Sequence, residues 1–167
     1  MSDSEARLLA DLEVAGVVFT VHEHEAVFTV EESAGLHEAI PGAHTKNLFL
    51  KDAKGRFWLV TLPHDRRADL KFIGRQTGAG KLSFANPDHL LRLLGVTPGS
   101  VTPLAAINDA DGVVSVVLDA AFDPAGTINV HPLRNTATLA LGFGDLVASL
   151  ARWGHAPQIV ALQPEQA

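Results

Sequence analysis

The sequence has no cysteine among its 167 residues. Disulfides, thiolate metal sites and cysteine nucleophiles are therefore excluded. It also has no apolar run near the roughly 20 residues that cross a bilayer. Its first residues, MSDSEARLLADLEVAG, carry acids and lack the cationic start of a secretory signal. We expect a cytoplasmic protein without a membrane partner.

Charged residues are few, at 19% of the chain, whereas 47% of the residues are hydrophobic. This composition is typical of a compact globular protein. The length is close to that of one domain, and no internal repeat or linker interrupts the chain. We therefore expect one domain over residues 1–167.

The charges are distributed unevenly. The formal net charge is −6, but residues 46–81 carry nine basic and three acidic side chains, which leaves −12 on the rest of the chain. Such a basic segment can attract phosphate groups, or it can be a solvated surface. It permits a nucleic-acid partner without demonstrating one, and no groove-reading pattern indicates DNA.

Start and stop signals predict interspersed helices and strands. Capping boxes at Ser2 and Thr29 open helices that end at Gly16 and before Pro41. The β-branched and aromatic run at 17–21 is typical of a strand.

A β-hairpin is predicted where NLFL and RFWLVTL flank a tight turn at 52–55. Asp65 is expected to cap the next helix, and Asn86 with the proline after it opens another that ends at Gly95. The remaining predicted elements are strands at 81–85, 113–119, 127–132 and 158–162 and a helix at 144–153. The fold class is therefore α/β, with a mixed central β-sheet flanked by helices.

Two neighbouring histidines suggest a metal site. His22 and His24 share one face of a predicted strand, so both imidazoles could reach one ion. A zinc site needs at least one further ligand, and no HExxH spacing is present. His37, His44, His64 and His131 could supply this ligand, but no spacing in the sequence points to any of them. A solvated strand end is the alternative interpretation, and a metal-dependent hydrolase is a secondary hypothesis.

The glycine-rich run from Gly74 to Lys81 resembles a phosphate-binding loop. It has one residue too many before its Gly-Lys pair, and Leu82 stands where serine or threonine would bind magnesium. No GxSxG motif is present either. The sequence therefore indicates neither a nucleoside triphosphatase nor an α/β-hydrolase nucleophile.

Several polar residues stand at the ends of predicted strands. Lys46 and Asn47 precede the apolar strand LFL and could supply a cation and hydrogen-bond donors to a phosphate, carbonyl or oxyanion. The Gly99-Ser100 turn lets backbone N–H groups approach a ligand, and His131 ends a strand where side chains commonly face a pocket. A surface charge, a plain turn and a structural histidine are the alternatives.

Four stretches carry a resemblance to a known family. They are HTKNLFLKDAKGRFWLVTLP (44–63), KLSFANPDHLLRLLGVTPGSVTPLAAIND (81–109), INVHPLRNTATLAL (128–141) and GHAPQIVAL (154–162). Together and in this order they resemble the YbaK/ProX family of aminoacyl-tRNA deacylases, and most closely its ProX-type prolyl-tRNA editing branch. The first 43 residues fit the family more loosely.

The resemblance implies a pocket that receives the acceptor end of a tRNA. Lys46 corresponds to the pivotal lysine of the family and Asn47 to its companion asparagine. Gly99 and Ser100 correspond to the turn that holds the aminoacyl ester through backbone groups, and His131 to a histidine that lines the aminoacyl pocket. The resemblance implies no metal or organic cofactor. A mischarged tRNA is the implied partner, a synthetase is a second candidate partner, and we expect a monomer.

The implied reaction is attack of water on the ester that joins a wrong amino acid to the tRNA. Lys46 would position the terminal nucleotide or the ester, and backbone N–H groups near Gly99 would stabilise the oxyanion. The neighbouring ribose hydroxyl of the tRNA is expected to help activate the water. Alanine on proline tRNA is the expected substrate by resemblance. The alternative is a tRNA-binding or aminoacyl-binding module of the same fold without catalytic activity.

Overall fold

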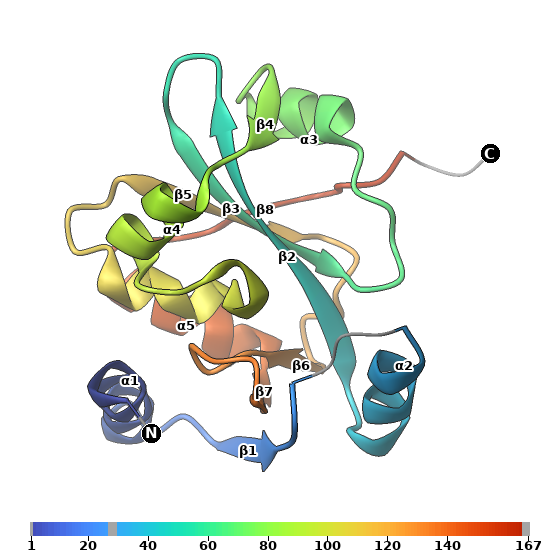
Figure 1. The fold of residues 1–167 in the computed structure, drawn as a ribbon, viewed down its shortest axis with the longest axis vertical. Helices are drawn as coiled ribbons and strands as arrows, with labels where there is room; N and C mark the ends of the chain where they lie inside the picture. Colours follow the sequence, from blue (N-terminus) through green and yellow to red (C-terminus); the bar gives the residue numbers. More distant parts are fainter. Residues whose placement is uncertain (1, 27–29, 165–167) are drawn as a thin grey trace.

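The computed structural model describes residues 2–26 and 30–164. Within them, eight strands form one sheet in the order β1-β7-β6-β2-β3-β5-β8, with β4 paired to β2 off this path (Figure 1). The strands are β1 Phe19–Glu23, β2 Ala43–Asp52, β3 Phe57–Pro63, β4 Leu82–Phe84, β5 Val114–Asp119, β6 Thr127–Val130, β7 Ala137–Gly142 and β8 Gln158–Val160. Three pairs, β2-β6, β3-β5 and β5-β8, are parallel and the others are antiparallel. The predicted α/β class with a mixed sheet is confirmed.

The long strand β2 joins the two parts of the sheet. Its first residues, Ala43 and His44, pair with β6, whereas residues 45–51 pair with β3. In Figure 1 this strand runs from beside α2 to the β2-β3 hairpin at the top of the view. Lys46 therefore lies next to the point where β2 changes its partner.

Helices cover both faces of the sheet (Figure 1). They are α1 Asp3–Val14, α2 Val30–Ala39, α3 Leu70–Thr77, α4 Pro87–Leu94 and α5 Phe143–Arg152, with short 3-10 helices η1 Pro98–Ser100 and η2 Pro103–Asn108. Leu59 of β3 belongs to the larger core cluster with residues of α1, α4, α5 and η2, and its neighbour Val60 belongs to a second cluster with Ile73 of α3. Successive strand residues point to opposite faces, so the unbroken apolar run of β3 reflects burial on both sides. Among the described residues, no helix has both the length and the apolar character that a membrane span requires.

Most of the predicted local signals are confirmed. The hairpin forms from β2 and β3. Ser2 caps α1 by accepting a hydrogen bond from the backbone N–H of Glu5, and Asn86 caps α4 by accepting one from the N–H of His89. The Thr29 cap lies outside the described residues, although the helix that it was expected to open, α2, is present.

One expectation about local structure fails, and one strand was not predicted. Asp65 does not cap a helix; Asp69 caps α3 instead by accepting a hydrogen bond from the N–H of Phe72. The chain first turns back after β3, where the N–H of Arg66 donates to the carbonyl of Pro63. Strand β7 was not predicted, because its alanines and glycine have low strand propensity. Pairing with β6 on one side and β1 on the other holds it in place.

The glycine-rich run has a structural explanation. A Cβ on Gly74 would lie 1.9 Å from the carbonyl oxygen of Gly80, so only glycine fits at this position. The N–H of Gly80 donates to the carbonyl of Gly74 at 3.2 Å, and Gly78 ends α3 in the left-handed conformation. The run therefore closes a helix against the turn that leads into β4.

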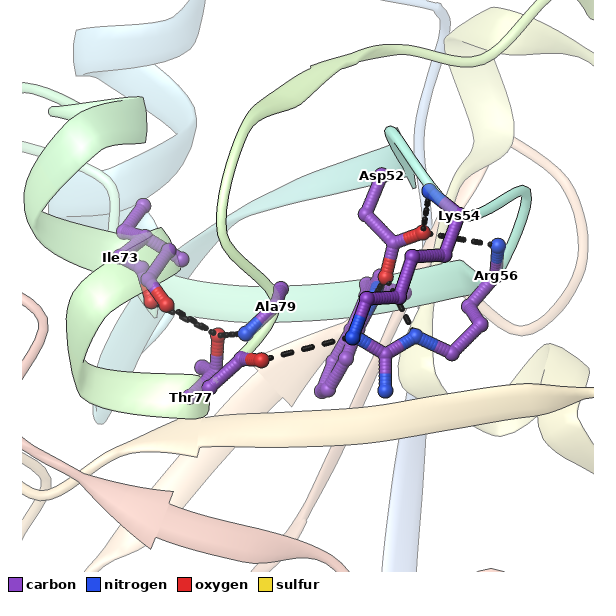
Figure 2. A network of polar contacts seen from close by, with 9 residues as sticks. Asp52, Lys54, Arg56, Ile73, Thr77 and Ala79 are labelled. Atoms are coloured by element: carbon purple, nitrogen blue, oxygen red, sulfur yellow. Dashed lines mark hydrogen bonds and ion pairs between the residues drawn. The ribbon is translucent and has the colours of Figure 1, made fainter.

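The β2-β3 turn is organised by one buried carboxylate (Figure 2). Asp52 Oδ1 accepts hydrogen bonds from the backbone N–H groups of Lys54 and Arg56, both at 2.9 Å. Its Oδ2 accepts from Arg56 Nε at 2.7 Å and from the indole N–H of Trp58 at 3.0 Å. Burial alone would raise the pKa of this carboxyl, but the hydrogen bonds from Trp58, Arg56 and Lys54 outweigh it and lower the pKa to about 2.

Candidate active site

A cavity of about 410 Å³ opens where the first residues of β2 meet β6, β7 and α2. Its lining combines small, apolar and polar side chains from four elements and from the loop after β3. The lining residues are Ser33, Ala34, Leu36, His37, His44, Thr45, Lys46, His64, Asn129, Val130, His131 and Thr138. Two of the residues predicted from the sequence, Lys46 and His131, both line this cavity. They are 85 positions apart in the chain.

Lys46 lies at the edge of this cavity. Its Nζ donates a hydrogen bond to the carbonyl oxygen of Arg66 at 2.5 Å. An ammonium group has three N–H donors, so two remain for a ligand. The hydrogen bond to Arg66 therefore holds the ammonium group in place and leaves two of its N–H donors available.

Asn47 does not line the cavity but supports a residue that does. Its Oδ1 accepts from the hydroxyl of Thr61 at 2.7 Å, and its Nδ2 donates to Thr45 Oγ1 at 3.1 Å. The Thr45 hydroxyl in turn donates to the carbonyl of Asn129 at 2.8 Å. Asn47 thus fixes the pairing of β2 with β6 at the cavity wall, and direct substrate binding by Asn47 stays a prediction.

The Gly99-Ser100 turn does not line the cavity either. It forms η1, and the N–H of Ser100 donates to the carbonyl of Thr97 at 2.9 Å. This N–H is therefore engaged within the turn. A Cβ on Gly99 would lie 3.1 Å from Asn135 Nδ2, so the turn packs closely on the loop that follows His131. Its predicted contact with the ester stays a prediction.

His131 directly follows β6 and lines the cavity. Its Nδ1 lies 3.0 Å from the carbonyl oxygen of Ala137, which can only accept, so Nδ1 carries the proton and donates. Burial lowers the pKa of His131, and the carbonyl of Ala137 offsets this only in part. The ring is therefore neutral near pH 7, with Nε2 as a hydrogen-bond acceptor.

The metal hypothesis finds no site in the described part of the chain. Both ring nitrogens of His24 are engaged, Nδ1 with the carbonyl of Glu25 at 2.8 Å and Nε2 with Thr138 Oγ1 at 2.9 Å. Over residues 2–26 and 30–164, no group of three or more His, Asp or Glu side chains is arranged to hold a metal ion.

Three further histidines form a cluster at the cavity. The ring centroids of His37 and His44 lie 4.2 Å apart, and those of His37 and His64 lie 4.1 Å apart. Burial, reinforced by the neighbouring imidazoles, lowers the pKa of His37 to about 4, and burial also lowers the pKa of His44. His44 Nε2 donates to the carbonyl of Ile40 at 2.7 Å, which ties the cluster to the end of α2.

The lowered pKa of His37 predicts acid sensitivity. A histidine whose pKa is lower in the folded state than its ordinary value of 6.5 binds protons more readily when unfolded. Its contribution to stability is complete above pH 6.5 and decreases as the pH falls toward about 4. We expect His37→Gln to lose less thermal stability than wild type between pH 7 and pH 4.5, measured by melting curves. His22→Gln is the matched control, and equal losses in wild type and His37→Gln would refute the prediction.

Sequence reasoning missed several residues of the cavity wall, among them Asn129 and Thr138. Asn129 stands between Ile128 and Val130, and an amide between two apolar strand residues is a signal that could have been used. Thr138 offered no such signal, because the strand that carries it was not predicted.

The fold and the cavity define a protein that can bind a small polar group beside a fixed cation and a neutral imidazole. A model of the aminoacyl-tRNA editing domain matches residues 24–148. The chain therefore belongs to the aminoacyl-tRNA editing domain family.

Individual relatives agree with this assignment. The chain is 41% identical over 164 residues to the Mus musculus "Prolyl-tRNA synthetase associated domain-containing protein 1", covering 95% of this chain and 96% of that protein. It is 37% identical over 145 residues to the "Prolyl-tRNA editing protein ProX" of Acetoanaerobium sticklandii, covering 86% and 88%. A crystal structure described as a candidate trans-editing enzyme for prolyl tRNA synthetase superposes with a TM-score of 0.73 at 25% identity, covering 99% of both chains.

Proposed function

We propose that this protein is a hydrolase that removes a wrongly attached amino acid from tRNA, with alanine on proline tRNA as its substrate. The observation that carries the proposal is the cavity in which Lys46 and His131 meet, in a member of the editing domain family. A relative named a prolyl-tRNA editing protein supports proline tRNA as the tRNA of this substrate, and the choice of alanine rests on the resemblance to the ProX-type branch.

The reaction is the hydrolysis of an ester. Water attacks the acyl carbon, a new C–O bond forms, and the bond to the ribose oxygen breaks; the products are the free amino acid and the tRNA with its hydroxyl restored. Lys46 has two N–H donors left to hold a phosphate or the ester oxygen as negative charge develops on it. We assign activation of the water to the neighbouring ribose hydroxyl of the tRNA, so that no protein general base is required.

Selectivity comes from the size and polarity of the cavity. A pocket that admits a small acyl group and excludes the larger cognate residue acts as the second sieve of an editing system. Val130 and Leu36 supply apolar contacts at the wall, and Lys46 stands at its edge. In the proposed reaction alanine is removed and proline is spared.

The experiment is a deacylation assay on proline tRNA charged in turn with alanine, serine, cysteine and proline, with and without a chelator. We expect rapid, chelator-insensitive loss of alanine and retention of proline. Release of a different small amino acid would correct the substrate and keep the enzyme class. No release from any of them by folded protein that still binds the tRNA would replace the proposal with a binding module.

A further inference from the structure

Two polar side chains that the proposed reaction has not used lie on one face of the sheet. Asn129 of β6 pairs with Ala140 of β7, which is two residues from Thr138. Directly opposed residues share a face, as do residues two apart on one strand. Asn129 and Thr138 therefore project from the same face, and both line the cavity.

Asn129 has an acceptor without a donor. Its Nδ2 donates to the carbonyl of Pro41 at 3.0 Å, which fixes the orientation of the amide. Its Oδ1 is buried and receives no hydrogen bond from the described residues. The residue is only 2% exposed, and buried polar atoms almost always have a partner. An unmatched acceptor behind a cavity wall leaves its partial negative charge uncompensated, which favours a cationic group in the cavity.

Thr138 is held as an acceptor by His24. The carbonyl oxygen of Glu25 accepts the proton on His24 Nδ1, so in the neutral imidazole Nε2 has only a lone pair. The hydroxyl of Thr138 must then donate to Nε2 across their 2.9 Å contact. The hydroxyl proton of Thr138 is therefore directed at His24, and Thr138 Oγ1 can offer only lone pairs to a ligand in the cavity.

These acceptors match one group of an aminoacyl ester. The α-ammonium group has three N–H donors and no acceptor, as in lysine. The described residues that line the cavity include no carboxylate to pair with it. We propose that Thr138 Oγ1 binds the α-ammonium group of the substrate, that the unmatched Asn129 Oδ1 adds negative potential at the cavity wall, and that His24 is a positioning residue that keeps Thr138 in the accepting orientation. The inference rests on the proposed function and deepens it.

The test compares two acyl groups that differ at the α-position. Alanyl and propionyl esters of the same proline tRNA have the same carbon skeleton, but only the alanyl ester carries the ammonium group. Each rate is divided by the rate of spontaneous hydrolysis of that ester. We expect Thr138→Val to lower kcat/KM for the alanyl ester by at least about tenfold, because the lost hydrogen bond is to a charged group. The propionyl rate should change less than about twofold.

Two variants and one fold measurement serve as controls. Thr138→Ser keeps the hydroxyl and should restore alanyl turnover, and Thr20→Val makes the same change at an exposed position of β1. Melting curves show whether Thr138→Val is folded. An equal loss on both esters, or unchanged alanyl turnover in Thr138→Val, would overturn the inference while the enzyme class stands. If wild type hydrolyses no aminoacyl ester, the proposed function fails, and the inference falls with it.

Discussion

Replacing Lys46 with alanine is expected to lower kcat/KM for deacylation by at least about 100-fold, the effect of losing one donor to a developing oxyanion. The side chain lies at the cavity edge with two N–H donors left for the ester or phosphate. Its hydrogen bond to the carbonyl of Arg66 is exposed to solvent, so losing it should leave the fold intact. The measurement is single-turnover deacylation of alanyl-tRNA, with the melting temperature recorded for each protein.

Lys51→Ala provides the matched control. Lys51 is a cation on the same strand, but it does not line the cavity and its Nζ lies 5.9 Å from the ring of Phe57. We expect this variant to retain deacylation within about twofold. A lysine outside the cavity can act on the tRNA only through its charge, and physiological salt screens that attraction. Turnover at the wild-type rate by Lys46→Ala would remove the lysine from the mechanism. A similar loss in both variants would indicate general attraction of tRNA instead.

The largest effect on stability is expected at Asp52. Replacing it with asparagine should cost about 3 kcal/mol of unfolding free energy, nearly as much as alanine, although asparagine has the same shape. Oδ2 receives two donors, from Arg56 and Trp58. An asparagine could place its NH₂ group at the position of Oδ2, where it would face the donors of Arg56 and Trp58. In the flipped orientation the NH₂ group would face the backbone N–H groups of Lys54 and Arg56. Either orientation leaves donors facing donors.

The measurement is the shift in melting temperature, which should be about 6–12 °C for a domain of this size. Asp65→Asn is the control, because its side chain is 70% exposed and its contact with Arg66 is 4.0 Å long. We expect that variant to shift the melting temperature by less than about 2 °C. An Asp52→Asn protein as stable as wild type would show that the hydrogen bonds of the turn contribute little.

The same carboxylate predicts a pH dependence. The pKa of Asp52 in the folded protein is about 2, below its ordinary value of 3.8. The stabilisation is therefore complete above about pH 4 and is lost as the pH falls through the folded-state pKa. Wild type should lose stability over this range more steeply than Asp52→Asn, which has no carboxyl to protonate.

Local signals in the sequence were sufficient for most elements. The caps at Ser2 and Asn86 act within one helical turn, so neighbouring residues determine them. The hairpin depends on a turn between two apolar runs and is likewise local. The failures had non-local causes. Strand β7 forms because β1 and β6 flank it, and α3 begins late because the chain turns back after β3.

For the site, the sequence by itself determined which residue types were present: a lysine before an apolar strand, a histidine at a strand end, and no cysteine. Only the tertiary structure decided which of them share a cavity. The parallel pairing of β2 with β6 brings His44 beside Asn129, and with them Lys46 and His131. The same packing leaves Asn47 behind the wall and the Gly99 turn outside it. A strand's local preference fixes neither its partner nor its register, because both depend on contacts with residues distant in the chain.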